Sequence, residues 1–334
     1  MLRIKKQNLF KQLWETHLSD YVTAVAWSPD GTQLAASSDA GEVILYTPTT
    51  GKSTCLQSPQ GESVDALAIS VDGQFLAAGG QAGTVWIWQI DGDVPTLLTT
   101  LAYARTWIDR LQWHPSSPEL AFSCGRCVKV WHAVEQTVVT TLNFEDSAVL
   151  DLAWHPQGTE LSLGGNQRIK TWPSDDWEQD PEVRAVGGAS LAIAWSPDGT
   201  YLASGNNNRS VLMWEKGNPY PWRLQGLPGK VRQLAWSGPT VKGAPLLALM
   251  SGKRIVVWTK TANPSKDGTM KVLDAHEGVV QAISFRPNTF LLASVAEDGC
   301  LYLWQKARRM AQTLEGTSGG FSCLAWSEQG TMLA

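Results

Sequence analysis

The stretch Trp195-Ser196-Pro197-Asp198-Gly199 recurs in related form along the chain. Each copy ends a short strand-like run and begins with an aromatic or apolar residue, which we call the anchor. The eight anchors are Trp27, Ile69, Trp113, Trp154, Trp195, Trp236, Phe285 and Trp326. They lie 41 to 49 residues apart, and a fixed period of this length indicates one supersecondary unit that packs against its own copies. Residues 1–334 are therefore predicted to form one domain.

Each repeat contains four strand-like runs. In the fifth repeat, residues 190–195 alternate, and further runs follow at 201–204 and 211–214. A fourth run precedes the next anchor, as residues 138–142 do before Trp154. No helical period competes with this pattern. Four-stranded antiparallel sheets repeated around a channel form a β-propeller, so we predict an all-β propeller.

Most of the tryptophans occupy two positions of the repeat. Besides the anchors, the third run of each repeat ends in an aromatic residue; these are Tyr46, Trp88, Trp131, Trp172, Trp214, Trp258 and Trp304. A ring at this position would fill the space between neighbouring sheets, and its burial is worth several kcal/mol at roughly 25 cal/mol per Å². The tryptophan content therefore indicates core and gives no signal for ligand binding.

The repeats resemble those of the WD-repeat (tryptophan-aspartate repeat) β-propeller family from about Leu9 to Ala334. In the seventh repeat, four residues stand where that family places a buried hydrogen-bonding tetrad; these are His276, Ser294, Asp298 and Trp304. Elsewhere the tetrad is eroded, since the first repeat has His17 and Ser37 but ends in Tyr46. The resemblance implies that sheet hydrophobics carry this fold more than the polar network does.

The number of blades is open between eight and seven. The family usually has seven, with the first strand of the chain closing the last blade, and residues 9–14 are the candidate for that strand. Residues 310–334 begin an eighth repeat, which stops before its third strand. We favour eight blades, the last one incomplete and closing with residues 9–14, over seven with an appendage, because an apolar half-repeat outside the ring would be an exposed patch. Residues 1–8 form a short basic tail.

Composition excludes several classes of protein. The 334 residues are 43% apolar and 17% charged, with a net charge of −4, which argues against a general nucleic-acid binder. The N-terminus lacks a secretory core region, and no apolar run reaches the 18 residues of a membrane span. The five cysteines form no framework of the secreted type. We expect a cytoplasmic protein with no membrane contact.

No catalytic or metal constellation emerges. Cys124 and Cys127 have metal-ligand spacing, but a zinc site needs four ligands and no second pair stands nearby. A metal or redox role competes here with a hairpin turn bordered by two small buried residues. His114, His132 and His155 are expected to be solvated turn residues. Without a nucleophile elbow or a phosphate loop, we expect neither enzymatic activity nor a cofactor.

The family resemblance implies a scaffold that holds partner proteins on the propeller faces. One face should carry a cationic sector with an aromatic residue; its candidate partner-binding residues are Arg105, Trp107, Arg126, Arg168, Arg209, Lys230, Arg232, Lys253 and Arg254. Asp109, Glu145 and Asp146 could offset this charge. The sector could instead bind a phosphorylated or nucleic-acid ligand, with the protein as accessory subunit of an enzyme, although nucleic acid is disfavoured by the net charge.

On the opposite face, Trp177 lies in an acidic loop of residues 173–181 and has no position in the repeat. An aromatic residue in a polar rim is typical of a protein interface. The alternative is that Trp177 folds back on the edge of its blade.

Overall fold

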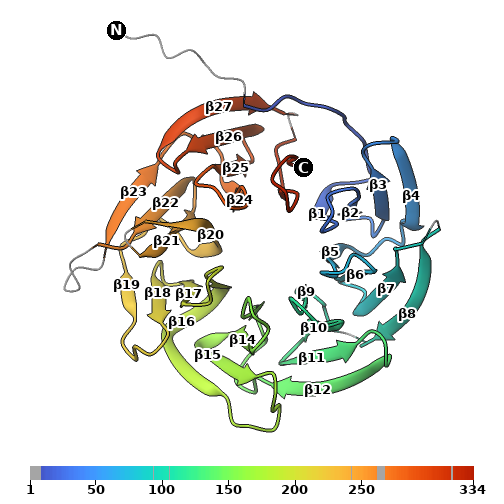
Figure 1. The fold of residues 1–334 in the computed structure, drawn as a ribbon, viewed down its shortest axis with the longest axis horizontal. Helices are drawn as coiled ribbons and strands as arrows, with labels where there is room; N and C mark the ends of the chain where they lie inside the picture. Colours follow the sequence, from blue (N-terminus) through green and yellow to red (C-terminus); the bar gives the residue numbers. More distant parts are fainter. Residues whose placement is uncertain (1–8, 93, 105, 242, 262–267, 317–318) are drawn as a thin grey trace.

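The computed structural model shows a ring of antiparallel sheets around a central opening (Figure 1). It describes residues 9–92, 94–104, 106–241, 243–261, 268–316 and 319–334. In the described residues, all of the regular secondary structure consists of β-strands. It therefore contains no helix long and apolar enough to cross a membrane. The prediction of an all-β propeller of four-stranded antiparallel blades is confirmed at this level.

Five of the sheets have four strands, which run in chain order from the inner to the outer side of the ring (Figure 1). The first contains β1 (Val22–Trp27), β2 (Leu34–Ser38), β3 (Val43–Thr47) and β4 (Lys52–Gln57). The second contains β5 (Val64–Ile69), β6 (Phe75–Gly80), β7 (Thr84–Gln89) and β8 (Thr96–Ala102). The third contains β9 (Leu111–Trp113), β10 (Glu119–Cys124), β11 (Cys127–His132) and β12 (Thr137–Asn143). The sheet of the sixth repeat contains β20 (Val231–Val241), β21 (Ala244–Ser251), β22 (Arg254–Thr259) and β23 (Thr269–Leu273). That of the seventh contains β24 (Val280–Phe285), β25 (Leu292–Ala296), β26 (Cys300–Gln305) and β27 (Arg309–Glu315).

The fourth and fifth repeats share one seven-stranded sheet. Its strands are β13 (Asp151–Trp154), β14 (Glu160–Gly164), β15 (Asn166–Pro173), β16 (Glu182–Trp195), β17 (Tyr201–Asn206), β18 (Val211–Glu215) and β19 (Trp222–Leu224). The long strand β16 joins two blades, since its first part pairs with β15 and residues 190–195 pair with β17. The expected count of eight blades is not confirmed by these sheets.

The two ends of the described chain lie near each other. Residues 321–334 lie between β24 and β1 in the ring (Figure 1), where Ala325 and Ala334 exchange two backbone hydrogen bonds of 2.8 and 3.0 Å. The backbone N–H groups of Leu9 and Phe10 donate to Gln312 Oε1, at 2.7 and 2.9 Å. Residues 9–14 form no strand, so that prediction is wrong. Side-chain bonds to Gln312 and ring contacts replace a regular ladder there, such as the contact between Phe10 and Trp326 at 5.2 Å.

The anchor tryptophans link each blade to the one before it. Trp113 Nε1 donates to the carbonyl of Ala68, which directly precedes the previous anchor, at 3.0 Å. The same bond recurs at four of the other five anchor tryptophans: from Trp154 to Gln112 (3.2 Å), from Trp236 to Ala194 (3.1 Å), from Trp326 to Ser284 (3.2 Å) and from Trp27 to Ala325 (3.0 Å). At the remaining one, Trp195, Nε1 is buried without a hydrogen-bond partner among the described residues. A large ring with one N–H donor suits this position, which explains why tryptophan stands at six of the eight anchors.

The core lies between neighbouring blades. The tryptophans that end the third strands are 0 to 6% exposed, as the sequence predicts. Between the second and third blades, for example, Ile87 and Phe75 pack with Phe122 and Trp131. These contacts fix the faces of the ring, on which the loops lie.

Two histidines depart from expectation. His114 and His155 are buried, so their prediction as solvated turn residues is wrong. His114 Nδ1 accepts the backbone N–H groups of Ser116 and Ser117, and its Nε2 lies 3.0 Å from the carbonyl of Gly158 in the next blade. His155 repeats this link to the carbonyl of Gly199, at 3.2 Å. Each imidazole therefore bridges two consecutive turns.

Candidate functional site

The seventh blade holds a closed polar network inside the sheet. Trp304 Nε1 donates to Ser294 Oγ at 2.9 Å, and Ser294 Oγ lies 2.8 Å from His276 Nε2. His276 Nδ1 lies 3.1 Å from Asp298 Oδ2, so this nitrogen carries the proton and the serine hydroxyl donates to Nε2. The carboxylate of Asp298 also accepts the backbone N–H of Glu277 at 2.8 Å. With Trp304 and His276 buried, this network ties a turn to its blade and has no opening for a substrate.

The first blade has no such network. His17 has a side chain that is 85% exposed, and Ser37 donates to the carbonyl of Val64 in the next blade. In the strand register Ala36, rather than Ser37, stands where Ser294 stands in the seventh blade, because Leu34 faces Tyr46 as Leu292 faces Trp304. The partial tetrad expected from the sequence is therefore wrong in this blade.

Trp107 is the most exposed tryptophan among the described residues, at 60%. It lies in the link between β8 and β9, and the next residue, Ile108, is fully buried and fixes the link to the core. The preceding residue, Thr106, approaches the turn between β10 and β11. We call the face that carries such fourth-to-first links and the second-to-third turns the Trp107 face.

Several predicted cations of the Trp107 face are already engaged. Arg168 pairs with Asp146 and Arg254 with Asp274, both at 3.0 Å. Lys253 Nζ donates to the carbonyl of Glu277 at 2.6 Å. Arg105 lies outside the described residues. Asp146 thus offsets the charge of Arg168, as the sequence suggested.

Four other predicted cations are exposed and form no ion pair with a described residue; these are Arg126, Arg209, Lys230 and Arg232. Arg126 donates only to the carbonyl of Glu145, at 3.4 Å. Arg209 has a left-handed backbone, with φ of 60°, and holds the tip of the turn between β17 and β18. The free positive charge is therefore spread over the third, fifth and sixth repeats.

The sequence did not single out Asp151, which links three consecutive blades. Its Oδ1 accepts Arg110 Nε at 3.0 Å, and its Oδ2 accepts the backbone N–H of Ile193 at 2.8 Å. Burial raises the pKa of Asp151, while Arg110 and the backbone donors oppose that rise. Arg110 and Asp151 occupy the same position of consecutive repeats, 41 residues apart, so an alignment of the repeats could have found the pair.

On the opposite face, Trp177 is half-buried and packs against the core of the third and fourth blades. Its ring lies 5.9 Å from that of Trp154, nearly perpendicular to it. Trp177 therefore folds back on its blade, which is one of the two interpretations that the sequence left open.

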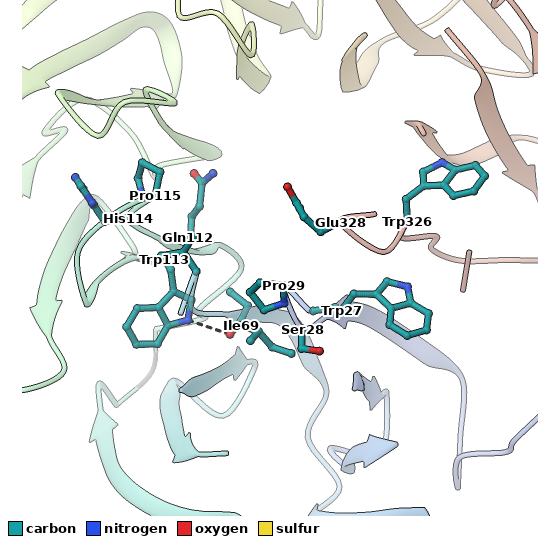
Figure 2. Close-up of a pocket in the computed structure, with 13 residues that line it drawn as sticks. Trp27, Ser28, Pro29, Ile69, Gln112, Trp113, His114, Pro115, Trp326 and Glu328 are labelled. Atoms are coloured by element: carbon teal, nitrogen blue, oxygen red, sulfur yellow. Dashed lines mark hydrogen bonds between the residues drawn. The ribbon is translucent and has the colours of Figure 1, made fainter. Parts of the chain in front are cut away.

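A pocket of about 450 Å³ lies on this opposite face, beside the central opening (Figure 2). The turns after four anchors line it, and Figure 2 shows Pro29, Ile69, Pro115 and Glu328 around an open space. Its wall is mainly apolar, with Glu328 as an exposed charge. Within the described ranges, no group of three or more His, Cys, Asp or Glu side chains is placed to hold a metal ion. The pocket offers shape and apolar contact rather than reactive groups.

Comparisons with known proteins agree with this architecture. The family described as "WD domain, G-beta repeat" matches residues 9–47, 53–89, 186–215 and 265–305. Comparison with curated protein sequences finds no match.

Solved structures share the fold at low sequence identity. The structure of Sqt1 from Chaetomium thermophilum bound to the N-terminus of the ribosomal protein L10 is 18% identical, with a TM-score of 0.80 over 94% of this chain and 93% of that one. The mitotic checkpoint complex contains a chain that is 20% identical, with a TM-score of 0.68 over 85% of this chain and 90% of that chain. The WD40 repeats of RRP9 match with 18% identity and a TM-score of 0.63 over 95% of this chain and 87% of theirs. With four repeats matched by the family and the sheets arranged as a propeller, this chain belongs to the WD-repeat β-propeller family.

Proposed function

We propose that this protein is a non-catalytic scaffold that holds a partner protein on the Trp107 face. The observation that carries the proposal is the 60% exposure of Trp107 on a link whose neighbour Ile108 is fully buried. An indole held out on a fixed backbone loses little conformational freedom when a partner covers it. Trp and Arg are the residues most enriched among interface positions that dominate binding energy.

The charges around Trp107 favour a protein partner over a phosphate-rich one. Arg168 and Arg254 already have carboxylate partners, so the continuous cationic sector expected from the sequence is broken. The remaining free cations suit a partner segment that carries acidic side chains near an apolar one. A polyanion would need several adjacent phosphate contacts.

A structural neighbour supports this mode of binding. Sqt1 from Chaetomium thermophilum, a propeller of the same fold, is seen with the N-terminus of the ribosomal protein L10. Only the kind of partner, a terminal segment of another protein, enters the proposal, because 18% identity shows the fold alone.

Affinity capture from a cell lysate tests the proposal with two matched variants. Trp107→Ser should abolish capture of the protein partner, whereas Tyr220→Ser should leave it intact, because Tyr220 is 80% exposed in the link between β18 and β19 on the opposite face. Capture should survive nuclease treatment and fall only gently as salt rises. Capture that needs nucleic acid, or is released steeply by salt, would instead support the phosphate-binding alternative.

We also propose that residues 319–334 are the inner part of an incomplete eighth blade. The anchor bonds support this, since Trp326 donates to Ser284 of the seventh repeat and Trp27 donates in turn to Ala325. Phe10, Leu324 and Leu333 pack around Trp326. The segment thus makes the same kind of contact with its neighbours that most anchor tryptophans make.

Truncation separates eight blades from seven with an appendage. Removing residues 319–334 should lower the melting temperature sharply, because it exposes the flanks of the first and seventh blades. Removing residues 1–14 should act in the same direction, since Phe10 covers Trp326. Truncated chains that melt like the intact protein would establish the seven-bladed arrangement.

A further inference from the structure

Two cysteines face each other across the turn between β10 and β11. Cys124 ends β10, Cys127 begins β11, and the two are register partners across a two-residue turn. Gly125 gives that turn its positive φ of 62°. Partners of this kind have Cα atoms about 5.5 Å apart, which is the middle of the range that a disulfide spans. Both side chains are half-buried, and both are free thiols.

The thiols lie near side chains that pack between the second and third blades. Since alternate residues of a strand share a face, Cys124 lies on the same side as Phe122, and Cys127 on the same side as Lys129. Phe122 packs on Tyr103, with ring centroids 5.6 Å apart, and Lys129 Nζ lies 5.4 Å from the centroid of the Tyr103 ring. The pair thus has aromatic walls and one nearby cation.

The two thiols differ in acidity. Hydrogen bonding between the two side chains lowers the pKa of Cys127 to about 6; burial opposes this shift, and Lys129 makes a smaller contribution that lowers the pKa further. The same hydrogen bond and burial raise the pKa of Cys124. Near neutral pH the pair therefore holds one thiolate and one thiol, the arrangement that disulfide exchange requires.

We propose that Cys124 and Cys127 are a redox-active dithiol, which closes to an intramolecular disulfide by exchange with a small disulfide such as oxidised glutathione.

The exchange has two balanced steps. Cys127 thiolate attacks one sulfur of oxidised glutathione, forming a mixed disulfide and releasing one glutathione thiolate. Cys124 then loses its proton to that thiolate and attacks Cys127 Sγ, which forms the Cys124–Cys127 bond and releases the second glutathione thiolate; solvent supplies the proton that this thiolate takes up. Two protein thiols are oxidised and one glutathione disulfide is reduced to two thiols.

The turn between the two cysteines is held by contacts on both sides. A Cβ on Gly125 would lie 3.5 Å from the methyl group of Thr106, the residue before Trp107. The backbone N–H groups of Phe144 and Val149 donate to the carbonyls of Arg126 and Gly125, at 2.8 and 2.9 Å. These bonds fix the backbone of the turn beside the link that carries Trp107, so the two sulfurs can approach each other without unfolding the hairpin.

Intact mass in glutathione buffers of increasing oxidised fraction tests the dithiol. The full chain should lose two hydrogen atoms, and so should Cys55→Ser, which removes an exposed thiol elsewhere. Cys124→Ser should instead retain one glutathione on Cys127, because nothing resolves the mixed disulfide. Cys127→Ser should react slowly at Cys124. A wild-type chain that accumulates glutathione on Cys127 without closing, or that stays reduced throughout, overturns the proposal.

Alkylation at pH 6 provides a second measurement that does not depend on disulfide formation. About half of Cys127 is thiolate at this pH, compared with roughly 0.3% of an ordinary thiol of pKa about 8.5, and the lower nucleophilicity of an acidic thiol removes about one power of ten. Cys127 in the folded chain should therefore react about tenfold faster than in the denatured chain. Equal rates contradict the proposal. Melting curves of each serine variant show that the folded protein is being compared.

Discussion

The third and seventh blades solve the same packing problem in different ways. Trp131 and Trp304 both end a third strand, and they face Leu120 and Leu292 in the same register. Two residues after Leu292, Ser294 accepts the indole N–H of Trp304. In the third blade Phe122 stands at the equivalent position, and Trp131 Nε1 is buried with no hydrogen-bond partner in the described chain.

The magnitudes explain why both solutions are stable. A buried unpaired donor costs about 1–3 kcal/mol, and full burial of a large apolar side chain contributes about 1.5–3 kcal/mol. The 0% exposure of Phe122 therefore offsets the unpaired N–H of Trp131. The polar network of the seventh blade is one way to fill the slot and not a condition for the fold.

The turns between the second and third strands of these two blades also differ in their polar contacts. In the seventh blade Asp298 is committed to His276 and to the backbone of Glu277 and Cys300. In the third blade no carboxylate of a described residue holds the turn, which is instead bordered by Cys124 and Cys127. Loss of the network thus leaves a turn whose side chains are available for other chemistry.

The largest expected effect is the loss of a slot-filling ring. Trp304→Ala and Trp131→Ala should each cost about 3–5 kcal/mol of unfolding free energy, the usual range for a core aromatic truncated to alanine. Trp177→Ala should cost clearly less, because Trp177 covers Trp154 from the surface and remains half-exposed. Urea unfolding of the three variants measures this. Similar losses at Trp177 and Trp304 would show that the loop residue belongs to the core.

Replacing the ring while keeping an aromatic side chain sharpens the comparison. Trp304→Phe leaves Ser294 Oγ without the indole N–H that it accepts, whereas Trp131→Phe removes an N–H that had no partner among the described residues. The seventh-blade variant should therefore lose about 1–3 kcal/mol more than the third-blade variant. Chemical denaturation of both proteins in the same buffer checks the difference. Equal costs would mean that the tetrad hydrogen bonds add nothing net.

Sequence reasoning was strongest where the repeat dictates the contact. The third-strand aromatics occupy the same position between neighbouring sheets in every repeat, so their burial could be predicted from the period. The same holds for the anchors, although the bond that five anchor tryptophans donate to a carbonyl of the preceding blade depends on a backbone geometry that a sequence pattern does not display.

It was weakest where a side chain has a choice of partners. His114 was expected in solvent, because its bridge to Gly158 depends on how closely two consecutive turns approach. His17 was expected in a tetrad, but the residues before β1 do not follow the course of those before β24, and its side chain is exposed. Trp177 could have faced solvent or the blade, and only the path of its loop decides.

A change in pH should alter the stability of the protein through the seventh blade, by a smaller amount than the substitutions above. Burial keeps the pKa of His276 below its ordinary value, although Asp298 opposes this. The unfolded chain therefore binds this proton more readily, and stability should fall as pH drops from about 6.5 toward the folded pKa. Hydrogen bonds from Cys300, Glu277 and His276 outweigh burial and lower the pKa of Asp298, so its contribution is lost only as pH falls below about 4.

The matched proteins for this measurement are the wild type and His276→Gln. Between pH 7.5 and 5.5 the wild type should lose more melting temperature than the variant, which has no imidazole to protonate in the seventh blade. His114 and His155 are present in both proteins, so their effect cancels. Parallel pH profiles would indicate that His276 keeps its ordinary pKa despite burial.

The smallest expected effect is that of a chelator, for which we predict no change. Asp298 and the pair of Cys124 and Cys127 occupy equivalent turns, but a structural zinc needs four ligands. The described residues offer the cysteine turn no group of three or more His, Cys, Asp or Glu ligands. Protein purified without chelator should therefore contain no stoichiometric metal, and its melting temperature should be unaffected by the chelator. One zinc per chain, absent from the Cys124→Ser variant, would contradict this and would make the third turn a metal site where the seventh is a hydrogen-bonded one.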